Sequence, residues 1–225
     1  MKKTLILLAC AMFSMTMSAG IASAYSIDYQ RQLLGNGGFT TNVTGALVET
    51  FDATSLNWNW SGDYKIRNTS SGISAQPYGL SGVDTTNFIS VPNNSSSGSV
   101  TAVEAVNLGS LYNYFGLWWG SVDTYNKIEF YKNGSLVDSI TGTQAISPSV
   151  ANGNQTAPST NLYVNIYGLK DFDSFKLIST NYAFEVDNIA VANIAPVPEP
   201  GTMMLLGVGM LGLAVFGKRR MNKEA

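Results

Sequence analysis

The stretch FGLWWGSVDTYNKIEFYKNG, residues 115–134, decides the fold. In its second half the apolar Ile128 and Phe130 alternate with polar or charged side chains at positions 127, 129 and 131. This period of two is typical of a strand with one buried face. Asn133 and Gly134 then supply the positive φ angles of a type I′ turn, so the next strand is expected to return antiparallel.

Similar short runs rich in Val, Ile, Phe, Tyr and Thr recur between clusters of Gly, Asn and Ser, and no sustained helical period is seen outside the two ends of the chain. These runs predict strands near residues 45–51, 63–67, 100–105, 114–119, 126–131, 135–140, 162–167, 174–179 and 184–192. About nine short strands in a body of roughly 170 residues predict an all-β fold, an antiparallel two-sheet β-sandwich of jelly-roll type.

Composition excludes most enzyme classes. The 225 residues include no histidine, and the one cysteine, Cys10, lies in the apolar N-terminal run. Ser-His-Asp and Cys-His arrangements and imidazole zinc sites are therefore excluded. Paired carboxylates could still hydrolyse glycosides, and Glu104, Asp123 and Glu129 lie nearest the tryptophans in sequence. Because an exposed Glu on an alternating strand is ordinary, we expect the protein not to be an enzyme.

The N-terminal residues 1–24 have the features of a secretory signal peptide: Lys2 and Lys3, an apolar run, and small residues at Ala22 and Ala24. Once they are removed, residues 25–196 form the predicted body. It holds seven basic and thirteen acidic side chains, a net charge of −6. An acidic body without a basic patch predicts that nucleic acid is not a partner.

The C-terminal residues 197–225 contain a proline-rich joint, an uncharged stretch at 201–217 and a basic end. The uncharged stretch is just long enough for a transmembrane helix, and the cations after it favour a cytoplasmic C-terminus. The joint consists of Val197, Pro198, Glu199 and Pro200, and the basic stop consists of Lys218, Arg219 and Arg220.

This order of elements resembles the PEP-CTERM sorting signal of Gram-negative bacteria that make exopolysaccharide. The resemblance implies that a membrane-embedded exosortase recognises the Pro-Glu-Pro motif and removes the helix. The membrane is then a partner only before processing, and the body is exported through the inner membrane to the cell surface or extracellular matrix. A permanent membrane anchor is the alternative, but it has no need of Glu199 between two prolines.

Three segments of the body, GNGGF at 35–39, the central stretch at 114–131 and FEVDNIAV at 184–191, resemble a family of exosortase-dependent surface proteins. The resemblance implies a secreted β-rich domain and brings no catalytic residue. The first and last of these segments also resemble galactose-binding-like domains, which is an analogy of fold alone.

Trp118 and Trp119 are neighbours, so in a strand they point to opposite faces and cannot both enter one core. One interpretation is that the second indole is exposed and stacks on a sugar ring, while Asp123, Tyr125 and Asn126 bond its hydroxyls. The other is that it packs beneath the polar loops, with Asp123 capping a turn.

The last predicted strand carries Asp187, a candidate calcium ligand, since hard oxygen ligands from separate strands can converge on calcium. An Asp that faces solvent or bonds a turn is the alternative. Strict alternation predicts that Phe184, Val186 and Asn188 share one face of this strand, and that Glu185, Asp187 and Ile189 share the other.

The function expected from the sequence is a non-enzymatic component of the extracellular polysaccharide matrix of a biofilm. Two classes stay open: a carbohydrate-binding protein with polysaccharide as its partner, and a structural or adhesive surface protein that binds a protein and has no sugar site. No cofactor is expected apart from the calcium considered at Asp187.

Overall fold

The computed structural model describes residues 25–93, 101–195 and 209–210. The predicted signal peptide lies outside these residues, as does nearly all of the predicted sorting segment. Among the described residues, no helix is long and apolar enough to cross a membrane. The body is built from strands and one short helix, α1 (Gly142–Ala145), so the predicted all-β class is confirmed.

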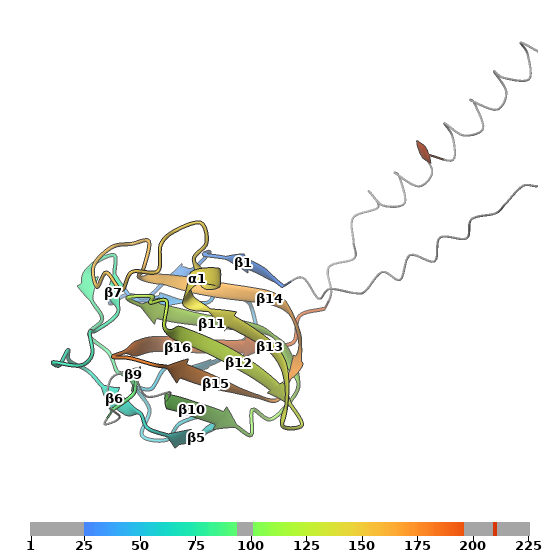
Figure 1. Ribbon diagram of the computed structural model, residues 1–225, viewed down its shortest axis with the longest axis horizontal. Helices are drawn as coiled ribbons and strands as arrows, with labels where there is room; N and C mark the ends of the chain where they lie inside the picture. Colours follow the sequence, from blue (N-terminus) through green and yellow to red (C-terminus); the bar gives the residue numbers. More distant parts are fainter. Residues whose placement is uncertain (1–24, 94–100, 196–208, 211–225) are drawn as a thin grey trace, which may run out of the picture.

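Two antiparallel sheets pack face to face (Figure 1). The larger has seven strands in the order β1 (Ser26–Asp28), β14 (Leu162–Phe172), β11 (Tyr112–Gly120), β16 (Phe184–Ala192), β9 (Phe88–Val91) and β6 (Lys65–Arg67), with β4 (Leu47–Glu49) also paired to β16. The smaller has the order β13 (Ser135–Thr141), β12 (Asn126–Lys132), β15 (Ser174–Ser179), β10 (Thr101–Val106) and β5 (Asn59–Gly62).

Two small hairpins lie outside these sheets. One joins β2 (Gln32–Leu33) to β3 (Phe39–Thr40), and the other joins β7 (Tyr78–Gly79) to β8 (Gly82–Val83). Neither was predicted, because a strand of two residues is too short to show a period.

From β9 onward the chain crosses repeatedly between the sheets. The larger sheet takes β9, β11, β14 and β16 in the order β9-β16-β11-β14, and the smaller takes β10, β12, β13 and β15 in the order β10-β15-β12-β13. This interleaved order of eight strands is the connectivity of a jelly roll. Strands distant in sequence therefore meet, and the ends of several strands gather at each end of the sandwich.

Aromatic side chains fill the space between the two sheets. The Phe115 ring of the larger sheet lies 4.7 Å from that of Phe175 and 5.1 Å from that of Phe130, both of the smaller sheet. Trp119 stacks on Phe184 with 4.5 Å between ring centroids. Buried aromatics contribute large apolar areas and preferred tilted geometries, so the contacts of Phe115 with Phe130 and Phe175 help to join one sheet to the other.

Strand β12 has the predicted alternation: Ile128 and Phe130 are fully buried, and the side chains between them are partly exposed. Asn133 and Gly134 have φ angles of 50° and 74°, as the predicted turn requires, and β13 returns antiparallel to β12. This prediction is confirmed.

The predicted alternation in β16 is wrong beyond Asp187. Asn188 has a φ of 48°, and the pairing with β11 shifts by one residue at this point, as in a β-bulge. Ile189 therefore joins Phe184 and Val186 in the core between the sheets. A one-residue shift moves every later side chain to the other face, and nothing in the sequence alternation showed it.

The two tryptophans do point to opposite faces, but both faces are covered. Trp119 is 0% exposed in the core between the sheets, and Trp118 is 1% exposed on the outer face of the larger sheet. Phe39 of β3 packs on Trp118 with 5.1 Å between ring centroids. A Cβ at Gly38 would lie only 2.8 Å from the Trp118 ring. An exposed indole is therefore not found, and hairpin residues cover Trp118.

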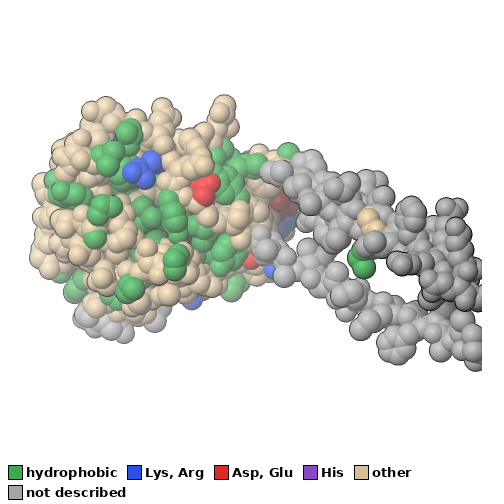
Figure 2. All heavy atoms as spheres, turned by 90° about the horizontal axis from the view of Figure 1, so that it is seen from above, with side chains coloured by type: hydrophobic (Ala, Val, Ile, Leu, Met, Phe, Trp, Pro, Cys, Tyr) green, Lys and Arg blue, Asp and Glu red, His purple; other side chains and the backbone are tan. Residues whose placement is uncertain are grey.

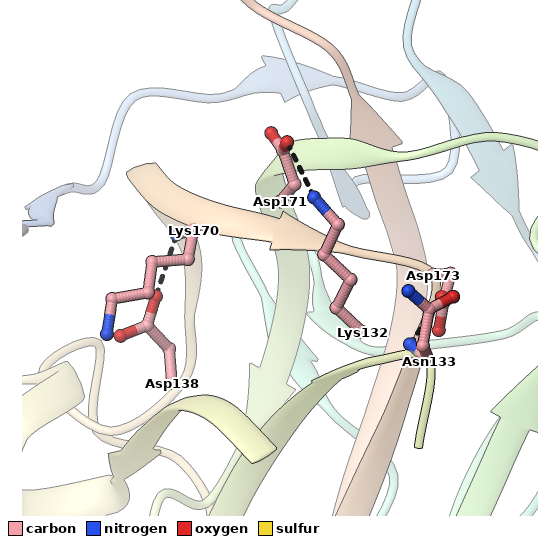
Figure 3. Close-up of polar contacts among 6 residues, drawn as sticks. All are labelled: Lys132, Asn133, Asp138, Lys170, Asp171 and Asp173. Carbon is pink, nitrogen blue, oxygen red and sulfur yellow. Dashed lines mark hydrogen bonds and ion pairs between the residues drawn. The ribbon is translucent and has the colours of Figure 1, made fainter. Parts of the chain in front are cut away.

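Polar contacts hold the β12–β13 hairpin to the region where β14 ends and β15 begins (Figure 3). Asp138 accepts a hydrogen bond of 2.7 Å from the Lys170 backbone, and Asp173 accepts one of 2.8 Å from the Asn133 backbone. Lys132 and Asp171 form an ion pair of 3.1 Å. These contacts fix one end of the sandwich.

Replacing either tryptophan by alanine should destabilise the fold, because each change empties a packed site. We expect Trp118→Ala and Trp119→Ala each to lower the free energy of unfolding by about 3–5 kcal/mol, measured by urea unfolding followed by circular dichroism. Leu136, which is 55% exposed in β13, is the control, and Leu136→Ala should change it by less than about 0.5 kcal/mol. If Trp118→Ala lowers the free energy of unfolding as little as Leu136→Ala does, the hairpin residues do not cover Trp118 in solution.

Candidate functional site

A polar pocket of about 320 Å³ lies at the opposite end of the sandwich from the contacts of Figure 3. We call it the end pocket. It lies where β11 ends and β12 and β16 begin, on the side of β7 in Figure 1. Its lining residues are Ser71, Gly72, Ile73, Ser74, Ala75, Ser121, Asp123, Tyr125, Asn152, Gly153, Gln155, Tyr182, Ala183 and Glu185.

Glu185 forms the inner part of the end pocket. It pairs with Gly120 of β11 and points away from the core that Phe184 and Val186 enter. The side chain is 2% exposed, and both carboxylate oxygens accept hydrogen bonds, Oε1 from the Ala75 backbone at 2.8 Å and Oε2 from the Ser121 hydroxyl at 3.0 Å. No lysine or arginine lines the pocket among the described residues, so these two donors are what compensates its charge.

Burial raises the pKa of Glu185 to about 7, because water no longer stabilises the charged form. The hydrogen bonds from Ala75 and Ser121 act in the opposite direction, and the nearby charge of Asp123 raises the pKa further. The carboxyl group therefore changes charge near neutral pH, and the charge of the end pocket changes with it.

Asp123 lies on the loop between β11 and β12 and is only partly buried. Its carboxylate packs over Gly153, where any side chain would collide with it, and the Gly153 backbone donates a 3.0 Å hydrogen bond to Val122 O. Burial raises the pKa of Asp123, and the neighbouring Tyr125 hydroxyl partly offsets that rise. Asp123 is thus a positioned carboxylate that stays accessible from the pocket.

Tyr125 and Tyr182 form another part of the lining. The Tyr125 hydroxyl donates a 2.5 Å hydrogen bond to Tyr182 O, which ties the loop before β12 to the loop before β16. Burial and the charge of Asp123 raise the pKa of Tyr125, so its hydroxyl stays protonated. Asn126 does not line the pocket; it is fully buried and donates a 3.2 Å hydrogen bond to Ala183 O.

Ser74 supplies a polar group with no partner. Its side chain is 7% exposed, and its hydroxyl oxygen is buried without a hydrogen bond although the residue lines the pocket. An unpaired buried hydroxyl costs free energy that a ligand group or water can restore. The end pocket therefore combines two carboxylates with at least one vacant hydrogen-bonding position.

The structure brings together two of the five residues that the sequence analysis named as candidate ligands. Asp123 and Tyr125 line the end pocket, Asn126 supports it from behind, and neither Trp118 nor Trp119 offers an exposed face. Sequence reasoning missed Glu185, Ser74 and Tyr182. The one available signal was Glu185 in an otherwise apolar closing strand, since a carboxylate there is either exposed or functional.

Asp187 lies in a separate buried place beneath the outer cover of β16. It is 0% exposed and accepts a 2.6 Å hydrogen bond from the Asn188 backbone. The Thr86 hydroxyl lies 2.5 Å from Asp84 Oδ1 and 3.4 Å from Asp187 Oδ2. Burial raises the pKa of both carboxyl groups, and each is close enough to affect the other. Within the described residues no group of three or more His, Cys, Asp or Glu is placed to hold a metal ion, so calcium at Asp187 stays a prediction.

Comparison with known protein families identifies a PEP-CTERM protein-sorting motif at residues 196–220. This confirms the sorting signal predicted from Pro198, Glu199 and Pro200 and from the basic stop. The motif implies processing by an exosortase, export, and a location at the cell surface or outside the cell. The residues that carry it lie almost wholly outside those the structure describes.

Two solved structures are weakly similar to this chain. A chain described as CpGH89CBM32-6 produced by Clostridium perfringens has 12% identity and a TM-score of 0.32, over 59% of this chain and 94% of its own. The K2 cleaved adhesin domain of Lys-gingipain has 12% identity and a TM-score of 0.33, over 67% of this chain and 99% of its own. No curated protein matches the sequence. Neither structural similarity is strong enough to support an argument about function.

The buried carboxyl groups predict that the fold is more stable in mild acid. The pKa of Glu185 is about 7 in the folded protein against 4.5 for an ordinary Glu. Between these values the folded state keeps a proton that the unfolded state has lost, so the free energy of unfolding falls as pH rises. This group alone accounts for about 3 kcal/mol. Chemical unfolding at pH 5 and pH 8 measures it.

The Glu185→Gln variant should show a smaller fall in unfolding free energy between pH 5 and pH 8. Glu129→Gln is the matched control: the Glu129 pKa is lowered, with Lys127 and the Tyr131 hydroxyl acting against its partial burial. Glu129→Gln should show the same fall in unfolding free energy between pH 5 and pH 8 as the wild-type protein. A wild-type protein equally stable, or more stable, at pH 8 would contradict the assignment of Glu185 as a buried, unneutralised carboxyl group.

Proposed function

We propose that the protein is an exosortase-processed surface protein of a Gram-negative bacterium and a non-enzymatic component of its extracellular polysaccharide matrix, which binds carbohydrate in the end pocket. The observation that carries the proposal is the pocket itself, which offers carboxylates, tyrosine hydroxyls, backbone groups and the unpaired Ser74 hydroxyl in about 320 Å³. Sugar hydroxyls both donate and accept hydrogen bonds, so they match such a mixed lining.

The size and position of the pocket support this proposal. Its volume is at the lower end of the range for small-molecule sites, about 300–1,000 Å³, and suits one or two sugar rings. Its walls come from loops at one end of a sandwich whose other end is fixed by the contacts of Figure 3. Loops on a rigid scaffold are where binding sites of β-sandwiches commonly lie.

The arrangement of the carboxylates favours binding over hydrolysis. A glycosidase needs one carboxyl group to donate a proton and another to act as base or nucleophile. Both oxygens of Glu185 already accept hydrogen bonds from the protein, and the side chain is almost wholly buried. Asp123 alone is then accessible from the pocket, and one carboxylate does not complete either mechanism.

The low density of charged side chains on one face of the protein suits a polysaccharide environment. Charged side chains are few and scattered on the face seen in Figure 2, among apolar patches and a majority of other polar or backbone atoms. Within the described residues the ion pairs are exposed or partly exposed, as at Lys132 and Asp171, and contribute little to stability. On this face the described residues present mainly other polar side chains and backbone to their surroundings (Figure 2).

Filling the end pocket tests the proposal. Gly72 lines the pocket and a Cβ there meets no atom within 4 Å, so Gly72→Trp should occupy the mouth without strain. Gly35 is equally open and lies outside the pocket, which makes Gly35→Trp the matched control. In calorimetric titration with the extracellular polysaccharide of the producing cell, wild type and control should bind saturably, and Gly72→Trp at least about tenfold more weakly.

Two results would contradict the proposal. Absence of saturable binding by the wild-type protein would leave the adhesive alternative, in which the body binds a protein partner and has no sugar site. Release of reducing ends from the polysaccharide, lost in an Asp123→Asn variant, would show that the pocket is catalytic.

A further inference from the structure

We infer that the end pocket selects sugars that carry a protonated amine, as in a polymer containing unacetylated amino sugars, over neutral or acidic sugars. This inference rests on the proposed carbohydrate-binding function and names the ligand class of the same pocket. The charged groups that line the pocket have no cationic partner among its described lining residues.

The lining carries two carboxyl groups, Asp123 and Glu185, and no cationic side chain among the described residues. Each ion pair seen in the described part of the chain lies on another surface, between Lys127 and Glu129, Lys132 and Asp171, and Lys176 and Glu104. The pocket therefore has a negative potential that no internal partner cancels, and a bound cation would cancel it. A uronic acid would add a like charge.

The two carboxyl groups have different tasks in this arrangement. Asp123 is partly exposed at the pocket wall, so an ammonium group can contact it directly. Glu185 lies deeper with both oxygens hydrogen-bonded, so it makes no contact of its own, and because its pKa is about 7 it becomes ionised when a cation binds nearby. The raised pKa of Tyr125 keeps its hydroxyl protonated, so this residue adds no charge to the lining.

A second observation points to a ligand in the same place. Ser74 lines the pocket and is more than nine-tenths buried, and its hydroxyl oxygen, buried just behind the lining, has no hydrogen-bond partner. It can accept from an ammonium group or bond a ring hydroxyl, and an ammonium group has three hydrogens to share among such acceptors. A carboxylate and an unpaired hydroxyl in one small pocket can both accept hydrogen bonds from the ammonium group of an amino sugar. An N-acetyl group carries no charge and offers a single N–H, so it matches these acceptors less well.

The test compares a chitosan-type glucosamine oligosaccharide with its N-acetylated form and with a uronic acid oligosaccharide of equal length. Calorimetric titration of the full-length protein at pH 6.5 should give at least about tenfold tighter binding of the amine form than of the N-acetylated form. The uronic acid form should bind least. Acetylation removes the charge and keeps the ring, so this comparison isolates the amine.

Two variants locate the contact. Asp123→Asn should weaken binding of the amine form about tenfold and change binding of the N-acetylated form by less than about twofold. Asp171→Asn makes the same change of charge at an exposed ion pair in the far end of the sandwich and should alter neither. Ser74→Ala breaks no hydrogen bond in the protein and should weaken both forms, because the ring as well as the amine lies beside it.

A measurement on the unmodified protein keeps the inference open to refutation if Asp123→Asn does not fold. A cation that binds beside Glu185 favours its ionised form, so binding of an N-trimethylated form of the oligosaccharide, whose ammonium charge does not depend on pH and takes up no proton, should release protons near pH 7. Titrations in two buffers with different ionisation enthalpies would then give different heats, and the N-acetylated form would not.

The outcomes separate this inference from the proposed function. Equal binding of amine and N-acetylated forms, preference for the uronic acid, or heats independent of buffer would overturn the amine selectivity while carbohydrate binding stood. Failure of every sugar and of the native polysaccharide to bind would overturn both.

Discussion

The burial of the central strands of the larger sheet, above all β16, on both faces is the constraint from which the rest of this structure follows. Every residue of β16 is buried, which is unusual for an antiparallel sheet that could leave one face to water. The inner face packs against the smaller sheet through Phe184, Val186 and Ile189. The outer face is covered by the two short hairpins and by neighbouring loop residues such as Val43, Ala75 and Thr86, so polar groups on that face must find partners inside the protein.

Glu185, Asp187 and Asn188 meet this requirement in different ways. The Asn188 side chain donates a hydrogen bond to the Phe39 carbonyl of β3, so it holds β3 against the outer face of β16. Asp187 accepts from the Asn188 backbone, and Glu185 accepts from the Ala75 backbone. Burying such groups costs free energy even when they are hydrogen-bonded, so they are weak contributors to stability. The proposed binding function would account for a carboxylate that is kept at this cost beside the end pocket.

The sequence predicted the parts of the fold that repeat a local pattern and missed the parts that depend on distant contacts. Alternation and the Asn133-Gly134 turn correctly placed β12 and β13. The hairpins that cover Trp118 have strands of two residues, and the bulge at Asn188 leaves no trace in the alternation. Asp123 and Tyr125 were identified as candidates because they follow the tryptophans, whereas Ser74 and Glu185 meet them only after β16 is placed beside β11.

The covering hairpins also explain why a sugar site would lie in the end pocket rather than on the tryptophans. An indole that stacks on a sugar must present a free face, but Trp118 is covered by Phe39 and by backbone at Gly38 and Gly79. Residues 71–75, which precede the covering strand β7 in the chain, lie at the strand ends and form one wall of the pocket. The aromatic rings thus hold the covering residues in place, and at their edge lies a polar pocket whose accessible carboxylate is Asp123. Recognition in such a site depends on charge and hydrogen bonds more than on aromatic stacking, and for that reason the amine, rather than the ring face, is the feature of the ligand that the pocket can distinguish.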